Sequence, residues 1–162
     1  MAMKTLTLTQ PWATLVAIGA KRIETRSWAT AYRGPLAIHA AKGFPRDARD
    51  FAGCQFVNHF LVTAGYATAD KHAGLPIGCV VATCQLIDCV QVRLASVVDG
   101  VVTPPLPKWN YLLTQQEYAF GNYEHGRFAW VLEDVKRCEP IPAKGALGLW
   151  EWESLTQRVP VL

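Results

Sequence analysis

The longest stretch of β-forming residues in the chain covers residues 79–92. It is rich in valine, isoleucine and threonine, whose side chains pack well on a pleated, half-buried surface. A run of this length predicts a central strand or a β-hairpin, so the fold must contain a sheet built around it. Its apolar part, residues 78–86, is too short to cross a bilayer, and we predict no membrane span.

Shorter segments on both sides of this run alternate apolar and polar residues, which predicts further strands. The segments are residues 5–9, 23–26, 36–41, 128–133 and 144–152. Pro140 and Pro142 should end the strand that begins at residue 128, because proline cannot donate to a sheet ladder.

Three helices are predicted between the strands. Residues 11–18 have a proline in the first turn and a glycine just past the last turn. Residues 46–64 place apolar side chains three and four apart, which indicates one amphipathic helix, with a break possible near Gly53, that covers the sheet. A short helix should begin near Thr114, where Glu117 completes a capping-box pattern.

The order of these elements contains no repeated strand–helix–strand unit. We therefore predict an α+β, mainly β fold, in which about three helices pack outside a mostly antiparallel barrel. The 162 residues suit a single domain, residues 1–155, followed by a tail, residues 156–162. Five cysteines without Cys-x-x-Cys spacing, and no recognisable signal peptide, predict reduced, buried thiols in a soluble cytoplasmic protein.

Charge is concentrated in residues 19–28, Gly-Ala-Lys-Arg-Ile-Glu-Thr-Arg-Ser-Trp, although only 18% of the chain is charged. The strand period places Glu24 and Arg26 on one face. Lys21 leaves the end of the preceding helix, and its four-carbon stem can reach that face. The alternative is a solvated edge strand whose charges form surface pairs that contribute little stability.

Several enzyme classes are excluded because their motifs are missing. The chain has no Gly-x-Gly-x-x-Gly, Walker or Gly-x-Ser-x-Gly pattern, and no zinc-deaminase signature. Four scattered histidines, and cysteines that alternate between strand faces, lead us to expect neither metal nor cofactor. The net charge of +3 is too mild for a protein that grips duplex DNA.

Aromatic residues with basic residues between them suit unpaired nucleic-acid bases. The chain has six tryptophans and five tyrosines, of which at least half of the tryptophans should be core residues. His39 is a candidate contact, but its alternative is a structural histidine, since no orienting partner is visible beside it. Lys42, at the end of the same strand, is the better contact for an anion.

Five ordered segments carry a resemblance to a known family. They are Leu-Thr-Gln-Pro-Trp, the 19–28 segment, Tyr-Arg-Gly-Pro-Leu-Ala-Ile-His-Ala, Ala-Phe-Gly-Asn-Tyr and Lys-Gly-Ala-Leu-Gly-Leu-Trp. Together they resemble the ASCH-domain (activating signal cointegrator homology) family of the PUA-like superfamily, and the resemblance extends to about Glu153. It implies a PUA-like β-barrel, a cleft lined by the Gly-x-Lys-x-x-Glu-x-Arg segment, and a role in binding RNA or modified nucleosides.

Proteins similar to this one include amidohydrolases that remove acyl groups from the N4 of cytidine with a lysine, a threonine and a glutamate. Others are RNA binders or weak ribonucleases. Lys21 matches the lysine, Glu24 stands at the threonine position, and Glu117 or Glu124 matches the downstream glutamate. This departure argues against a hydroxyl nucleophile, and the chain looks closer to longer members with a Glu-Thr-Arg segment.

The resemblance and the charged segment together predict metal-independent hydrolysis of N4-acylated cytidine or a related acylated nucleoside, with Lys21, Glu24 and Arg26 as catalytic residues. A noncatalytic module for single-stranded RNA, or a weak ribonuclease, is the alternative. The expected partner is a modified nucleoside or single-stranded RNA, with no membrane and no obligatory protein partner. The candidate substrate-binding residues are Gln10, Pro11, Trp12, Trp28, Tyr32, Arg33, His39, Lys42, Glu117, Glu124 and Lys144.

Overall fold

The computed structural model describes residues 2–66, 74–98 and 101–153. The predicted tail and the domain boundary at residue 155 lie outside these ranges. Six strands form one sheet in the order β2-β7-β4-β3-β1-β8. Their bounds are Ala2–Leu8 (β1), Ile23–Arg26 (β2), Gly34–Ala40 (β3), Cys79–Gln91 (β4), Phe128–Pro142 (β7) and Leu149–Glu153 (β8).

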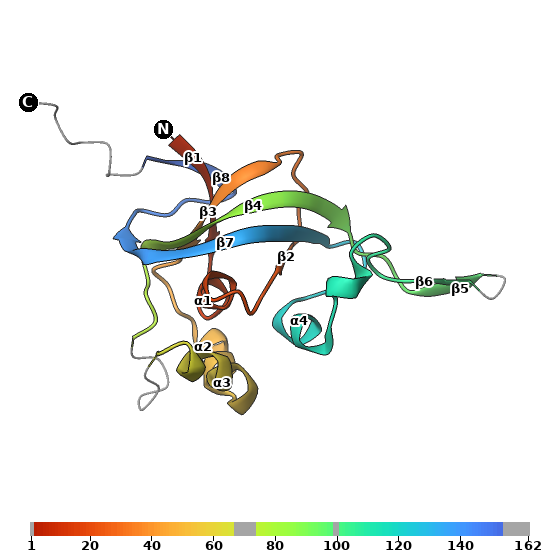
Figure 1. Cartoon of the computed structure of the whole chain (residues 1–162), viewed down its shortest axis with the longest axis horizontal. Helices are drawn as coiled ribbons and strands as arrows, with labels where there is room; N and C mark the ends of the chain where they lie inside the picture. The colour runs from red at the N-terminus through yellow and green to blue at the C-terminus, as the bar shows by residue number, and fades with distance from the viewer. Residues whose placement is uncertain (1, 67–73, 99–100, 154–162) are drawn as a thin grey trace, which may run out of the picture.

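The predicted central strand is confirmed as β4, which lies beside β7 across the middle of the molecule (Figure 1). β1 and β3 pair in parallel, and the other neighbours in this sheet are antiparallel. The mainly β, mostly antiparallel fold class is therefore confirmed. Pairing between β2 and β8, which would close the sheet into a barrel, is not detected among the described residues.

The largest errors in the predicted strand boundaries are in β7 and β8. β7 continues through Pro140 and Pro142 instead of ending before them. β2 pairs only with the first residues of β7, so the later part has β4 on one side alone and tolerates residues that cannot donate to a second neighbour. The last strand begins at Leu149 and not at Lys144, because Gly148 has a φ of +68°, outside the strand region.

A two-stranded hairpin between β4 and the fourth α-helix was not predicted. It pairs β5 (Ser96–Val98) with β6 (Val101–Thr103), and it projects away from the main sheet (Figure 1). Its strands are only three residues long, too short for an alternating pattern to stand out in the sequence.

The predicted first helix is confirmed as α1 (Trp12–Ala17), which lies between the sheet and a second helical layer (Figure 1). Val16 packs in the core of the sheet, whereas Leu15 packs against the second layer. That layer consists of α2 (Arg46–Gly53) and α3 (Gln55–Thr63), separated at Cys54 by an extended backbone. The helix predicted for residues 46–64 is thus two helices, with the break next to Gly53, where a break was foreseen. They cover α1 instead of the sheet because α1 already occupies this part of the sheet face.

The predicted helix near Thr114 is confirmed as α4 (Gln115–Phe120), which follows a single 3₁₀ turn (Asn110–Leu112). No described helix is long and apolar enough to span a membrane. All five cysteines are free, as predicted, but only Cys79 and Cys84 are buried. Cys54 is exposed and lies at the extended residue that separates α2 from α3.

Candidate functional site

The turn after α1 directs Lys21 back into the protein. Gly19 adopts a φ of +78°, a left-handed conformation that glycine reaches without strain. The amide of Lys21 then donates to the carbonyl oxygen of Leu15 at 3.0 Å, which folds the segment against the helix end. The Lys21 residue is 1% exposed.

Glu24 lies between two cations at the start of β2. Its Oε2 is 3.5 Å from the Nζ of Lys21, and its Oε1 is 3.5 Å from NH1 of Arg26. Lys21 Nζ also donates to the carbonyl oxygen of Ile23. β2 is an edge strand, as the alternative interpretation assumed, but the Lys21 and Glu24 side chains are only 1% and 9% exposed. The pair is therefore buried, not solvated.

Glu117 of α4 holds the backbone of this segment. Its two carboxylate oxygens accept hydrogen bonds from the amides of Arg22 and Ile23, each at 2.9 Å. Thr114 caps the helix by accepting from the Glu117 amide. The reciprocal bond of the predicted capping box does not form, because the Glu117 carboxylate binds the amides of Arg22 and Ile23 instead. Burial raises the pKa of the Glu117 carboxyl, against the lowering effect of the nearby Lys21 charge.

A cavity of about 310 Å³ opens beside Glu24. Its walls come from α1, α2, β2 and the turn after α4, and Trp12 is the predicted substrate-binding residue that lines it. Trp12 stacks on Phe51 with ring centroids 5.2 Å apart, and its indole N–H donates to the Phe120 carbonyl oxygen at 2.8 Å. This aromatic pair is a rigid apolar surface facing the same space as a carboxylate.

Three polar lining residues of this cavity were not predicted: Thr25, Asn122 and Arg127. The Arg127 guanidinium donates to the carbonyl oxygens of Thr25 and Asn122, each at 3.2 Å, and the Asn122 amide donates to Thr25 Oγ1 at 3.1 Å. No local sequence signal pointed to them, because it is the antiparallel pairing of β2 with β7 that sets Thr25 opposite Ala129 and brings Arg127 alongside.

Tyr123 is a buried polar residue next to this cluster. It is 8% exposed, and its hydroxyl is among the buried polar atoms without a hydrogen-bond partner in the described structure. Burial raises the pKa of the phenol, and the charges of Glu117 and Glu24 add to the effect. The hydroxyl therefore keeps its proton and is a potential donor.

The other predicted contacts on the N-terminal side have different surroundings. Trp28 packs edge-on against Trp130 at 4.7 Å, with the Arg26 guanidinium 5.7 Å from its ring. Tyr32 donates to the Pro35 carbonyl oxygen at 2.6 Å. Arg33 pairs with Asp88 at 3.2 Å, away from Glu24.

Gln10 and Pro11 are buried, and the Gln10 side chain forms hydrogen bonds with backbone groups. Gln10 donates to the Pro76 carbonyl oxygen at 2.7 Å and accepts from the Thr14 amide at 3.1 Å. Glu124 is exposed, and among the described residues its carboxylate has no partner. Of the two candidate downstream glutamates, Glu117 is thus the one that contacts the Lys21–Glu24 segment.

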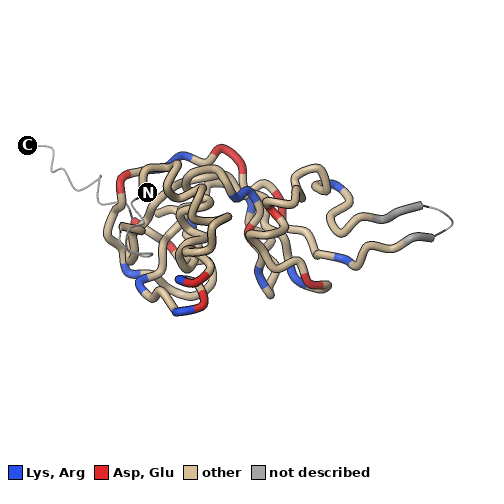
Figure 2. The backbone as a smooth tube through the Cα atoms, turned by 90° about the horizontal axis from the view of Figure 1, so that it is seen from below, with Lys and Arg blue, Asp and Glu red and all other residues tan. Residues whose placement is uncertain are grey.

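Charges of both signs are interspersed along the chain (Figure 2), and the described residues form no continuous basic stripe. No group of three or more histidine, cysteine or carboxylate side chains in the described part of the chain could hold a metal ion. The electrostatic character of the site therefore comes from Lys21, Glu24, Arg26 and Arg127.

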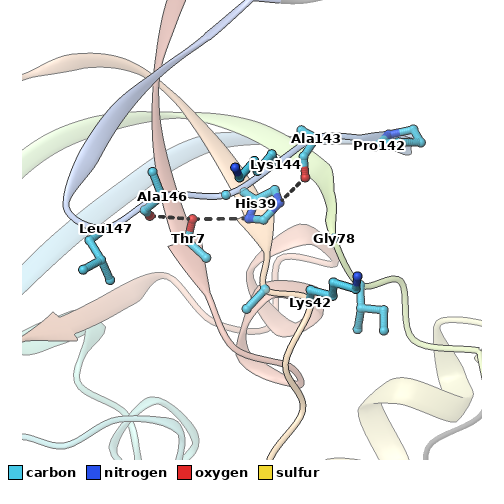
Figure 3. Close-up of a pocket in the computed structure, with 12 residues that line it drawn as sticks. Thr7, His39, Lys42, Gly78, Pro142, Ala143, Lys144, Ala146 and Leu147 are labelled. Atoms are coloured by element: carbon cyan, nitrogen blue, oxygen red, sulfur yellow. Dashed lines mark hydrogen bonds between the residues drawn. The ribbon is translucent and has the colours of Figure 1, made fainter.

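His39, Lys42 and Lys144 do not join the Glu24 cavity. They line a second cavity of about 890 Å³, at the ends of β1 and β3 and along the connection between β7 and β8 (Figure 3). None of the residues lining one cavity also lines the other. His39 has the properties of a hydrogen-bonded structural histidine, with its Nε2 2.9 Å from the Ala143 carbonyl oxygen.

Comparison with known proteins gives a family and two relatives. The family model described as ASCH domain matches residues 6–142. Activating signal cointegrator 1 of Mus musculus is 35% identical over 85 residues, and that of Homo sapiens is 34% identical over 85 residues. Each alignment covers 52% of this chain and 14% of the relative, so the chain spans a small part of those proteins.

Proposed function

Because this chain belongs to the ASCH-domain family, whose PUA-like fold binds RNA, we propose that the Glu24 cavity accepts an N4-acylated cytidine and hydrolyses its amide. One observation carries the proposal: a buried carboxylate flanked by two cations forms part of the wall of a nucleoside-sized cavity. Small-molecule sites commonly have about 300–1,000 Å³ of volume and a few converging polar groups.

The acylated base would lie on the aromatic surface of Trp12 and Phe51. Stacking of a base on an aromatic side chain contributes about 1 to 3 kcal/mol and favours no particular base. Glu24 supplies the selectivity, since a carboxylate accepts a hydrogen bond from the N4–H of cytosine. Its contacts with Lys21 and Arg26 are 3.5 Å long, which leaves acceptor capacity for a substrate or a water molecule.

Hydrolysis would proceed with Glu24 as the general base. Glu24 takes a proton from water as the water oxygen attacks the acyl carbonyl carbon, and the carbonyl oxygen becomes an oxyanion. Arg127 is the cation on the cavity wall and would stabilise that charge. As the bond between the acyl carbon and N4 breaks, Glu24 returns the proton to N4, which yields cytidine and a carboxylic acid.

Lys21 and Arg26 take roles different from those first predicted. Neither lines the cavity, and the Lys21 side chain is 1% exposed, so its ammonium would not reach a bound substrate. Both act as positioning residues that fix the two oxygens of Glu24. Glu117 contributes indirectly, by binding the backbone of the segment from which Lys21 and Glu24 project.

The test is incubation of the purified protein with N4-acetylcytidine and N4-benzoylcytidine, with cytidine quantified by chromatography. Glu24→Gln should lower kcat/KM at least about 100-fold, the usual contribution of a general base. Glu151→Gln is the matched control, because Glu151 forms an exposed pair with Lys4 and should leave the rate unchanged. Near-parent activity of Glu24→Gln would contradict the assignment.

A noncatalytic RNA-binding module is the second candidate, and one contact favours it. Next to the cavity, the guanidinium of Arg26 lies over the Trp28 ring at 5.7 Å, and both side chains are partly exposed. Such cation–aromatic pairs suit a strand of unpaired bases. If neither acylcytidine is cleaved and a short single-stranded RNA binds with salt-dependent affinity, this second function replaces the first.

A further inference from the structure

The second cavity has walls built from four separate parts of the chain. It is lined by the end of β1, the end of β3 with the residues after it, the two residues before β4, and residues 142–147 (Figure 3). Its volume of about 890 Å³ exceeds that of the Glu24 cavity and lies within the range of small-molecule sites. The proposed hydrolysis uses none of its residues.

The connection between β7 and β8 is held over this cavity by two side chains, the buried His39 and the partly exposed Thr7. The imidazole of His39 donates from Nε2 to the Ala143 carbonyl oxygen at 2.9 Å, and Thr7 Oγ1 donates to the Ala146 carbonyl oxygen at 3.2 Å. Trp150 Nε1 donates to Thr7 Oγ1 at 3.0 Å. These bonds come from the sheet itself, so the cavity wall is fixed and not a loose loop.

Gly145 lies between these two anchors and against the histidine ring. A Cβ atom at this position would be 2.6 Å from Cε1 of His39 and 3.2 Å from Thr7 Oγ1. Only glycine lets the backbone come this close to the His39 ring, and the close contact keeps the connection between β7 and β8 near the sheet. Lys144 and Ala146 therefore have defined positions on either side.

The chemistry of the lining has two components. Lys42 and Lys144 supply positive charge, no acidic side chain lines the cavity, and neither lysine has an ion-pair partner among the described residues. The walls beside them are apolar and accessible, since Ile77 is 47% exposed and Leu147 98% exposed. A ligand that satisfies both components is an anion joined to an apolar or aromatic body.

We propose that this second cavity binds a phosphate monoester of an aromatic group, with the phosphate attracted by the two lysines of the lining and the ring against its apolar wall. The positive charge of two lysines at one cavity attracts a doubly charged phosphate monoester more strongly than a singly charged carboxylate. Lysine is a common point-charge partner of phosphate. The source of the group is either a free mononucleotide or the terminal phosphate of an RNA strand.

The probe is cytidine 5′-monophosphate, and its binding is measured by isothermal titration calorimetry. We expect binding that weakens at least about tenfold in the double variant Lys42→Gln, Lys144→Gln, equivalent to about 1.4 kcal/mol. Both lysines are exposed, so the variant should fold, and an unchanged melting temperature verifies this. Lys136→Gln, Arg137→Gln is the matched control, because it also removes two positive charges at exposed positions outside the cavity.

Further titrations, with other ligands and variants, locate the site and identify the source of the phosphate. Cytidine without phosphate should bind at least about tenfold more weakly. Glu24→Gln removes the carboxylate that would hold cytosine in the other cavity, so monophosphate binding that persists in this variant and is lost in the double-lysine variant belongs to the second cavity. A 5′-phosphorylated RNA that binds through the lysines while the mononucleotide does not would assign the site to RNA termini.

Three results would overturn the proposal: no binding of either phosphorylated probe, equal affinity of the monophosphate and cytidine, or parent-like affinity in the double-lysine variant. Loss of binding in Glu24→Gln with retention in the double-lysine variant would place the ligand in the other cavity.

Discussion

Lys21 brings an ammonium group into the interior with two oxygen partners, the carboxylate of Glu24 and the carbonyl of Ile23. A buried ammonium group in this position depends on both acceptors, because a buried charge that loses its partners is costly. The same dependence applies to Glu24, whose side chain is 9% exposed.

We expect Lys21→Met to lower the free energy of unfolding by about 3–5 kcal/mol, because it leaves the Glu24 carboxylate buried with one cation fewer. The double variant Lys21→Met, Glu24→Gln should be less destabilised than the sum of the two single variants. Urea denaturation measures all three. Arg22→Gln is the control, since the Arg22 side chain is 46% exposed and pairs with Glu133 only at 3.9 Å. Additive effects would show that Lys21 and Glu24 are not energetically coupled.

At the scale of elements, two side chains connect α4 to the segment before β2: the Glu117 carboxylate, and the Gln116 amide, which donates to the Ala20 carbonyl oxygen at 2.8 Å. Glu117 accepts from two consecutive backbone amides, so the helix and the strand start are held together without any contact between regular hydrogen-bond ladders. Removal of this connection would release the backbone that positions Lys21 and Glu24.

Glu117→Gln should destabilise the protein by about 1–3 kcal/mol, because the amide can accept from only one of the two N–H groups. The pH dependence has a defined sign. Burial raises the pKa of Glu117 above its ordinary value of 4.5, so the folded state binds a proton that the unfolded state has lost. The advantage of the parent over Glu117→Gln should therefore fall as the pH rises from 4.5 through the raised pKa.

Urea denaturation of both proteins across this pH range measures the effect. Glu124→Gln is the control, because Glu124 is exposed and lies in the turn after the same helix. A parent advantage that grows with pH would mean that the carboxylate is favoured in its ionised form by the two amides.

On the scale of the whole molecule, strand periodicity and helix-end residues predicted most of the elements. The run at residues 79–92 became β4, and the turn at Gly19 was predicted by the glycine itself. The extent of β7 was not predictable, because the prolines are tolerated only where β2 has already ended. Sequence periodicity does not show which neighbours a strand has.

The residues of the candidate site that are close in sequence were predicted, and those brought in from distant parts of the chain were missed. Lys21, Glu24 and Arg26 are close in sequence, and a short strand brings them together. Arg127 reaches Thr25 only through the pairing of β2 with β7, which no local pattern reveals. His39, Lys42 and Lys144 were grouped with Glu24 by residue type, but the topology places them in another cavity.

Since the two cavities share no lining residue, their variants should act independently. The effects of Glu24→Gln and of Lys42→Gln, Lys144→Gln on the free energy of unfolding should add to within about 0.5 kcal/mol. The combined variant, compared with its parents in urea, provides the measurement. A larger interaction energy would indicate that the sheet couples the cavities.

The pairing of β1 has a consequence for biosynthesis. β1 lies between β3 and β8, and its residue Ala2 is opposite Glu153. During synthesis on the ribosome, β1 can pair with its parallel neighbour β3 early. Its other edge stays unpaired until β8 emerges much later. Contacts across so long a stretch of chain form slowly. Until then, the nascent protein exposes an unpaired strand edge, which is the kind of surface that chaperones shield.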